Sequence, residues 1–251
     1  MIQDLHTHTI FCDGNNTAEE MVVAALDKGI ERLGFSGHSF TEFDSSFCMS
    51  EGNTRAYKRE IKRLKAKYDG VIKILMGVEQ EYFSAAPTRG YDYVIGSLHY
   101  IEAGGEYHSV DDTEEVAANI VKSYFDGDWY AYAKRYFETV SDVVNRTGAD
   151  IIGHLDLVTK FNEGNRFFDE TDERYLEPAY RAIEKLVKHG VAFEINTGAI
   201  FRGYRSEPYP GPLLRKHIIE CGGSFILSSD AHSTEGLLYG FDEWKHLVHL
   251  D

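Results

Sequence analysis

The feature that most constrains the fold is an alternation of short apolar segments with longer amphipathic ones along the whole chain. Each short segment has four to eight residues, many of them β-branched or aromatic, which is typical of strands buried on both faces of a parallel sheet. The segments are residues 1–5, 33–36, 71–78, 91–98, 150–153, 191–195 and 224–227. Seven strands that alternate with helices predict a mostly parallel α/β sheet, closed or nearly closed into a barrel.

The segments between the apolar runs have the spacing of amphipathic helices. Thr17 and Glu20 form a capping box at the start of the first helix, which continues to Gly29. Further helices are expected at residues 54–68, 113–147 (broken near 126–128), 174–189, 212–221 and 235–250. Because no repeat, low-complexity stretch or proline-rich linker divides the chain, we expect a single domain over residues 1–251.

Composition and charge exclude several classes of protein. The 41 acidic residues outnumber the 26 basic ones and give a net charge of −15, which disfavours binding to nucleic acid. No apolar run reaches the ~18 residues of a membrane span, and the amino terminus lacks the pattern of a signal peptide. The three cysteines are scattered without a CxxC pair, as in a reduced cytosolic protein. We therefore expect a cytoplasmic protein, and its oligomeric state is left open.

Side chains of metal-ligand type lie at the ends of the predicted strands. The carboxyl ends of the strands in a parallel barrel open on one face, so these side chains are expected to converge on a single cleft. They are His6, His8, Asp13, His38, Glu79, His99, His154, Asp230 and His232.

The residue types and spacings in this set predict metal binding. In each of the pairs His6–His8 and Asp230–His232, both side chains point to the same side of the chain. Glu79 follows an apolar run and needs a compensating cation. A single His at one of these positions is more often a hydrogen-bonded core residue, so the prediction rests on the whole set.

The number and kind of ligands indicate more than one ion. A tetrahedral zinc ion takes three or four protein ligands, so nine candidates predict two or three ions that share bridging carboxylates. Imidazole and carboxylate ligands without thiolate suit zinc, manganese or iron. Closely spaced cations favour hydrolysis of a phosphoester by in-line displacement.

Six motifs together resemble those of the polymerase-and-histidinol-phosphatase (PHP) family of metallohydrolases. They are HTHTIFCDG, SGHS, GVEQEY, GSLHY, GHLD and SSDAHS, in the order of the family and over essentially the whole chain. The resemblance implies a distorted (β/α)7 barrel with three divalent ions at the carboxyl ends of its strands. It implies one ion held by His6, His8, Glu79 and Asp230, a second by Glu79, His99 and His154, and a third by Asp13, His38 and His232.

Three further segments are most similar to the histidinol-phosphate phosphatases of histidine biosynthesis. They are HSVDD, GHLDLVTKF and EINTGAIFRG, which begin at residues 108, 153 and 194. The resemblance implies hydrolysis of L-histidinol phosphate to L-histidinol and phosphate, and cationic residues that hold the phosphate after the fifth and sixth strands. Arg202 and Lys160 occupy those positions; the first can contact phosphate through two donors and the second adds a point charge. We hypothesise that a hydroxide bridging the ions attacks phosphorus, without a covalent nucleophile.

Several alternatives stay open at this point. The leaving-group acid is Asp156, Glu42 or a ligand histidine, and carboxylates that select the cationic substrate are Glu42, Asp44, Glu81 or Asp156. The rival functions are a PHP phosphoesterase for nucleotides or other phosphate esters, a 3′–5′ exonuclease, and a non-catalytic metal-binding domain. The net charge of −15 argues against the exonuclease, and the complete set of ligand positions argues against the non-catalytic domain.

Overall fold

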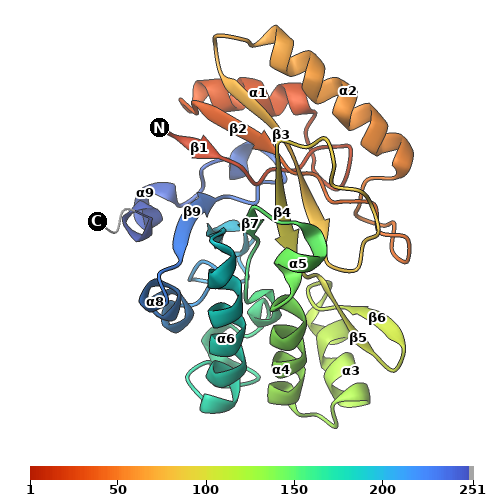
Figure 1. Cartoon of the computed structure of the whole chain (residues 1–251), viewed down its shortest axis with the longest axis vertical. Helices are drawn as coiled ribbons and strands as arrows, with labels where there is room; N and C mark the ends of the chain where they lie inside the picture. The colour runs from red at the N-terminus through yellow and green to blue at the C-terminus, as the bar shows by residue number, and fades with distance from the viewer. Residues whose placement is uncertain (249–251) are drawn as a thin grey trace.

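The computed structural model describes residues 1–248, in which seven parallel strands curve into a nearly closed barrel (Figure 1). In sheet order they are β1 (Gln3–Asp4), β2 (Arg32–Phe35), β3 (Lys73–Glu81), β4 (Tyr93–Ser97), β7 (Ile151–Ile152), β8 (Ala192–Asn196) and β9 (Ser224–Ser228). Every neighbouring pair is parallel. Each of the seven predicted strands overlaps one of these, so the predicted fold class is confirmed.

The first and last strands of the barrel are joined by backbone hydrogen bonds that lie beyond their carboxyl ends. An isolated parallel bridge pairs Thr7 with Ala231. The backbone N–H of His8 donates to the carbonyl of Ala231 at 2.8 Å, and the N–H of Ala231 donates to the carbonyl of His6 at 3.1 Å. The barrel therefore closes at the level of the two histidines that end the first strand.

Below this closure, the buried carboxylate of Asp4 also joins the first strand to the end of the chain. It accepts hydrogen bonds from the backbone N–H groups of Ser229 and Leu238, both at 3.2 Å. Burial raises the pKa of Asp4, although hydrogen bonds from the Ser229 side chain and from the backbone of Ser229, Leu238 and His6 oppose the effect.

A tyrosine on β4 reaches across the barrel toward β1, β2 and β3. The hydroxyl of Tyr93 donates to the backbone carbonyls of Leu5 and Phe35. A Cβ atom at Gly34 or at Gly77 would lie 2.3 Å from the Tyr93 side chain, so only glycine leaves room for it. This ring thus packs against the strands that carry the first candidate ligands.

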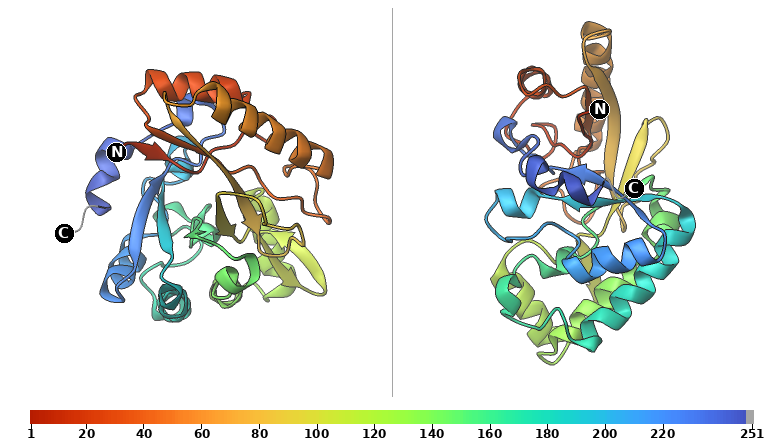
Figure 2. Two further views of the ribbon diagram at one scale, coloured as in Figure 1. Left: turned by 45° about the horizontal axis from the view of Figure 1, so that its top comes forward. Right: turned by 90° about the vertical axis from the view of Figure 1, so that its left-hand side faces the viewer.

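Helices cover the outside of the barrel (Figure 2). The α-helices are α1 (Ala18–Asp27), α2 (Glu51–Lys67), α3 (Glu114–Tyr124), α4 (Trp129–Val140), α5 (Val143–Thr147), α6 (Glu173–Leu186), α7 (Gly198–Phe201), α8 (Pro212–Glu220) and α9 (Phe241–Trp244). Short 3-10 helices are η1 (Leu157–Thr159), η2 (Glu163–Asn165), η3 (Val187–His189), η4 (Thr234–Gly236) and η5 (Lys245–Leu247). None of the helices described in residues 1–248 has the length and apolarity needed to cross a membrane.

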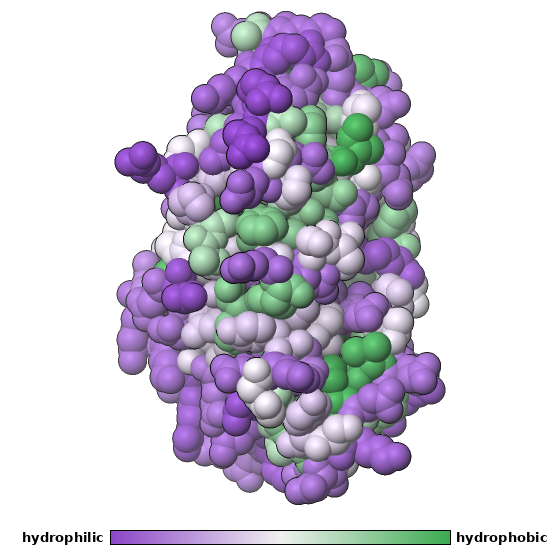
Figure 3. Space-filling model, turned by 90° about the vertical axis from the view of Figure 1, so that its right-hand side faces the viewer, coloured by the Kyte–Doolittle hydropathy of each residue, from purple (hydrophilic) through white to green (hydrophobic). Residues whose placement is uncertain are grey.

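The apolar core is divided between two sides of the barrel. One cluster packs α1 and α2 against β2 and β3, and a larger one packs α4, α6 and α8 against β7 and β8 (Figure 1). The predicted capping box is present, since the Thr17 side chain accepts from the N–H of Glu20 and the Glu20 carboxylate accepts from the N–H of Thr17. The surface seen in Figure 3 is mainly hydrophilic, with apolar side chains in small separate patches.

Two parts of the described chain differ from the sequence prediction. A two-stranded antiparallel hairpin, β5 (Tyr100–Ala103) and β6 (Glu106–Ser109), was not expected. The predicted helix at 235–250 is wrong over its described part, where only η4, α9 and η5 form, and its last two residues lie outside the described range. The left-handed backbone of Leu238 and Gly240, with φ of 58° and 71°, interrupts that helix. The expected break in 113–147 is present, since α4 begins after Asp128.

Candidate metal centre

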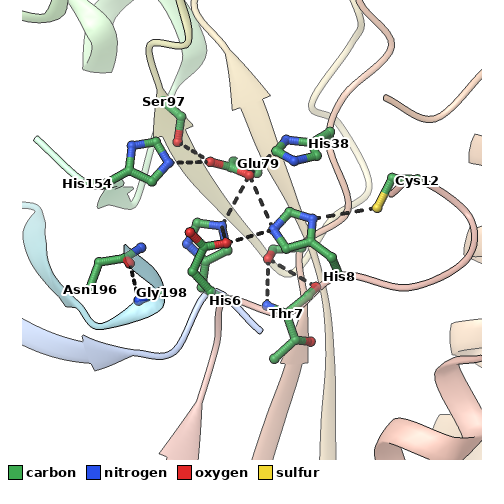
Figure 4. A network of polar contacts seen from close by, with 12 residues as sticks. His6, Thr7, His8, Cys12, His38, Glu79, Ser97, His154, Asn196 and Gly198 are labelled. Carbon is green, nitrogen blue, oxygen red and sulfur yellow. Dashed lines mark hydrogen bonds and ion pairs between the residues drawn. The ribbon is translucent and has the colours of Figure 1, made fainter. Parts of the chain in front are cut away.

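The structure brings all nine predicted ligand side chains together where the barrel closes (Figure 4 shows five of them by label). We call these nine the rim cluster. They lie on β3 or in the segments that follow the carboxyl ends of β1, β2, β4, β7 and β9. Most are buried, but the side chains of Asp13 and His232 are 30% and 25% exposed, which leaves one side of the cluster open.

Glu79 lies at the centre of the rim cluster, and one of its oxygens faces three histidines. Its Oε2 lies 2.9 Å from His38 Nδ1 and 3.2 Å from His6 Nε2. The Nε2 of His8 lies 3.5 Å from the same oxygen. A single buried carboxylate oxygen on β3 thus contacts residues that follow two other strands, β1 and β2.

The other oxygen of Glu79 faces the opposite half of the cluster. Its Oε1 lies 2.9 Å from His154 Nε2 and 3.3 Å from His99 Nε2. The hydroxyl of Ser97 donates to this oxygen at 2.7 Å. Glu79 therefore separates two groups of imidazoles, as a carboxylate that bridges two cations does.

Asp230 and Asp13 complete the cluster on its more open side. Asp230 Oδ1 lies 3.3 Å from His8 Nε2 and 3.6 Å from His6 Nε2. Asp13 Oδ2 lies 3.2 Å from His232 Nε2 and 3.5 Å from His38 Nε2. Carboxylates and imidazoles thus alternate around the cluster.

Unpartnered buried atoms within the cluster fit a cation. The Nε2 atoms of His6 and His8 and the Oε2 atom of Glu79 are buried and lack a hydrogen-bond partner. Three buried polar atoms without partners are costly unless a bound ion compensates them. Potential ligand atoms of three groups lie within 4.8 Å of one another: His6, His8 and Glu79; His38, Glu79 and His99; and His8, Asp13, His38 and His232. Imidazole and carboxylate donors without thiolate suit zinc, manganese or iron.

The close approach of buried carboxylates and imidazoles shifts the pKa values of the cluster. Burial would raise the pKa of Glu79, but His6, His38 and His99 lower it well below its ordinary value. Burial, together with the nearby imidazoles, lowers the pKa of His8 to about 3, which keeps this imidazole neutral. A neutral imidazole is the form that binds a metal.

Two further carboxylates contact the cluster: Glu194, which was given no role from the sequence, and Glu81, which was considered only for contact with the substrate. The Oε1 atom of Glu194 lies 2.7 Å from His6 Nδ1, and Oε2 of Glu81 lies 3.0 Å from His99 Nδ1. Both carboxylates are buried, and Glu81 also accepts from the backbone N–H of His99 at 2.9 Å. Such carboxylates commonly orient metal-binding histidines. The sequence signal for Glu194 was an acidic residue inside the apolar strand β8.

A cavity of about 400 Å³ adjoins the rim cluster, and both predicted phosphate-binding residues, Arg202 and Lys160, line it. Arg202 Nη2 lies 3.0 Å from Asp230 Oδ2, so this guanidinium is next to the cluster. Lys160 Nζ lies 3.4 Å from Asp111 Oδ2 and donates to the carbonyl of Asp111. The cation of Lys160 is therefore held at the wall of the cavity by a neighbouring carboxylate.

The structure shows which of the predicted carboxylates lie where they could contact the non-phosphate part of a substrate. Asp44 lines the cavity, and its Oδ2 accepts from the Tyr100 hydroxyl at 2.7 Å. Among the four carboxylates considered for substrate contact, Asp156 and Glu81 are buried and do not line the cavity, which favours Asp44 over them. Asp156 instead accepts from the N–H of Gly211 at 2.9 Å, and it is no longer a candidate for the leaving-group acid. Glu42 does not line the cavity either.

The fold and the rim cluster define a parallel barrel protein with a multi-ligand metal-binding site. The PHP domain matches residues 4–198, and the chain therefore belongs to the PHP family. The "Probable histidinol-phosphatase" of Deinococcus radiodurans is 30% identical over 244 residues, covering 91% of this chain and 85% of that relative. The "Histidinol-phosphatase" of Lactococcus lactis is 28% identical over 247 residues, covering 91% and 83%.

Solved structures support the same fold. A candidate histidinol phosphatase, hisK of Listeria monocytogenes, superposes with a TM-score of 0.84 at 23% identity, over 96% of this chain and 99% of that one. The histidinol phosphate phosphatase of Lactococcus lactis, complexed with zinc, L-histidinol and phosphate, gives a TM-score of 0.72 at 24% identity, over 98% and 92%. At these identities the likeness shows the (β/α)7 barrel.

Proposed function

We propose that this chain is a metal-dependent phosphomonoesterase that converts L-histidinol phosphate and water to L-histidinol and phosphate, a step of histidine biosynthesis. The observation that carries this proposal is the position of Arg202 and Lys160 in one cavity with the rim cluster. Two cationic side chains beside a metal-ligand cluster suit a phosphate group. The names of the relatives that match nearly the full chain support the particular substrate.

The rim cluster would hold three divalent ions of zinc, manganese or iron. The proposed sets are His6, His8, Glu79 and Asp230 for the first ion, Glu79, His99 and His154 for the second, and Asp13, His38 and His232 for the third. The contacts of Glu79 with imidazoles on both of its oxygens support its role as the shared ligand. When bound, divalent cations lower the pKa of coordinated water and neutralise the charge of a phosphate ester.

The side chains of the cavity would orient the substrate. Arg202 would donate to two phosphate oxygens, and Lys160 would add a second positive charge from the other wall. On the cavity wall, Asp44 would meet the organic half of the substrate, and its carboxylate accepts from the hydroxyls of Tyr100 and Ser46. An ionised carboxylate there would accept from the ammonium of histidinol, because Asp44 has a lowered pKa: burial would raise it, but these donors lower it.

We also propose that residues 1–251 form a single PHP-type domain and that its substrate is a small phosphorylated molecule and not a nucleic acid. The net charge of −15 supports the second point, because a long nucleic acid would approach a negative surface.

A substrate panel tests the proposal. Phosphate release from L-histidinol phosphate, a nucleoside monophosphate and p-nitrophenyl phosphate is measured with protein reconstituted with zinc or manganese, and a labelled oligonucleotide is incubated in parallel. We expect the highest kcat/KM for histidinol phosphate and an intact oligonucleotide. A higher kcat/KM for the nucleotide, or shortening of the oligonucleotide, would overturn the assigned substrate. The Glu79→Gln variant, purified in the same way, controls for contaminating phosphatases.

A further inference from the structure

The carboxylate of Glu194 contacts two members of the rim cluster from behind. Its Oε1 lies 2.7 Å from His6 Nδ1, and its Oε2 accepts from the backbone N–H of His154 at 3.1 Å. The side chains of Glu194 and His6 are both fully buried. Glu194 on β8 thus connects residues that follow β1 and β7, two strands that are not neighbours in the sheet.

The imidazole of His6 uses its two nitrogens differently. Nδ1 faces Glu194, whereas Nε2 is buried, has no hydrogen-bond partner and lies 3.2 Å from Glu79 Oε2 (Figure 4). An ionised carboxylate can only accept, so the Nδ1 atom of His6 carries the proton that is shared with Glu194. The lone pair of a neutral imidazole is then on Nε2, directed at the centre of the cluster.

Asn196, two residues further along β8, extends this contact toward the cavity. Its Nδ2 donates to Glu194 Oε2 at 3.0 Å, and its Oδ1 accepts from the N–H of Gly198 at 2.9 Å. Gly198 begins α7, and Arg202 follows the end of that helix. A Cβ atom on Gly198 would lie 2.9 Å from Arg202 Nη2, so the turn that starts at Asn196 holds the guanidinium closely.

We propose that Glu194 is a positioning residue of the metal centre, which fixes the tautomer and direction of His6, and that Asn196 connects it to the segment that carries Arg202. The inference rests on the proposed function for the identity of the ions and of the phosphate. Nothing in the contacts of Glu194 requires direct access to substrate, since the carboxylate lies behind His6.

Glu194→Gln is the sharpest variant, because it preserves shape and removes the second acceptor oxygen. An amide must turn its NH₂ group either toward His6 Nδ1 or toward two other donors, the N–H of His154 and the Nδ2 of Asn196. Either arrangement breaks a hydrogen bond that the carboxylate makes. Loss of such an outer contact typically lowers metal affinity about 10- to 100-fold.

The experiment titrates zinc into chelator-stripped protein against a competing chromophoric chelator, without substrate. We expect Glu194→Gln to bind zinc about 10- to 100-fold more weakly than the wild type at the tightest site. Asp156→Asn is the matched control, because it alters an equally buried carboxylate that accepts from the N–H of Gly211, which is not a member of the rim cluster, and its zinc affinity should equal that of the wild type. Equal affinity in Glu194→Gln and the wild type overturns the inference.

A measurement on the wild type covers the case in which Glu194→Gln does not fold. In the zinc-loaded protein, long-range ¹H–¹⁵N correlation spectra should show the His6 proton on Nδ1 and none on Nε2. A proton on Nε2 would overturn the positioning role.

The link to Arg202 is tested with Asn196→Ala. Removal of its two hydrogen bonds should weaken binding of inorganic phosphate to the zinc-loaded protein by roughly 2- to 10-fold. Unchanged phosphate binding overturns the link. Both zinc readouts are independent of turnover, so a wild type that binds zinc but does not hydrolyse histidinol phosphate would reject the proposed function and leave the role of Glu194 intact.

Discussion

The guanidinium of Arg202 lies 3.0 Å from the carboxylate of Asp230, measured from Nη2 to Oδ2. The other oxygen of Asp230 lies 3.3 Å from His8 Nε2 within the rim cluster. Burial would raise the pKa of Asp230, but Arg202 and His6 lower it well below its ordinary value. The same carboxylate thus faces a proposed phosphate-binding group and a proposed metal site. A phosphate that binds Arg202 must compete with Asp230 for its donors.

Replacement of Arg202 should weaken substrate binding more than it affects metal content. Arg202→Lys keeps the charge and loses the two-donor contact, so we expect KM for histidinol phosphate to rise about 10-fold, and more in Arg202→Ala. Steady-state kinetics measure this effect, and elemental analysis of the same samples gives the metal content. Arg181→Lys, on the exposed face of α6, is the control and should match the wild type. An unchanged KM in Arg202→Ala would remove this residue from the phosphate site.

Glu79→Gln should abolish both turnover and metal retention. The neutral amide cannot replace an anion that faces imidazoles on both oxygens. Loss of a direct ligand should exceed the roughly 10- to 100-fold effect of an outer contact. Ser97→Ala, which removes only the 2.7 Å hydrogen bond to Glu79, is the graded comparison and should retain most of the metal. Wild-type activity in Glu79→Gln would exclude Glu79 from the site.

Zinc binding should release protons at neutral pH. Burial by itself would lower the pKa of His99, but Glu79 and Glu81 raise it to about 10 in the metal-free protein. This imidazole is therefore protonated at pH 7, and a metal must displace its proton. Calorimetric titration of zinc in two buffers of different ionisation enthalpy should show net proton release. Identical heats in the two buffers would contradict this prediction.

The raised pKa of His99 also makes the stability of the metal-free protein depend on pH. Because the folded pKa of His99 lies above the unfolded value of 6.5, its stabilising contribution is complete below pH 6.5 and is lost as the pH rises toward 10. Bound zinc removes this dependence, so the free energies of unfolding of metal-free and zinc-loaded protein should diverge between pH 7 and 10.

Asp156 should make the protein less stable as the pH rises. Its burial raises the pKa to about 6 from 3.8, so the folded state binds the proton more tightly than the unfolded state does. The stabilising contribution of that proton is lost as the pH rises through 6. In Asp156→Asn this loss is absent. The difference in the free energy of unfolding, variant minus wild type, should therefore increase by about 1 kcal/mol from pH 5 to pH 8. Urea unfolding at both pH values measures it, and a difference that does not change with pH would refute the assignment.

The sequence was sufficient to predict the strands and the rim cluster, because both follow from one geometric rule. Parallel strands end on the same face, so metal-ligand residues placed after them converge, however far apart they are in the chain. His6 and His232 illustrate this: they are separated by most of the chain, and both contact the same cluster.

The contacts behind the cluster could not be predicted in the same way. The position of Glu194 inside an apolar strand and of Glu81 at the end of β3 indicates that each needs a partner, but only the direction of the side chain distinguishes an orienting carboxylate from one that meets substrate. The β5–β6 hairpin did carry a sequence signal, since Gly104 and Gly105 form a two-residue turn between its strands, with φ of 63° and 83°. The predicted carboxyl-terminal helix failed because helical spacing alone does not reveal the positive φ of Leu238.

The most direct test of the account is phosphate release from L-histidinol phosphate by chelator-stripped protein, before and after addition of zinc or manganese, with bound metal measured in the same samples. We predict that the stripped protein is inactive, and that activity returns in proportion to metal bound by the wild type but not by Glu79→Gln. Full activity in the stripped protein, or no activity in a metal-loaded wild type, would contradict a metal-dependent histidinol-phosphate phosphatase.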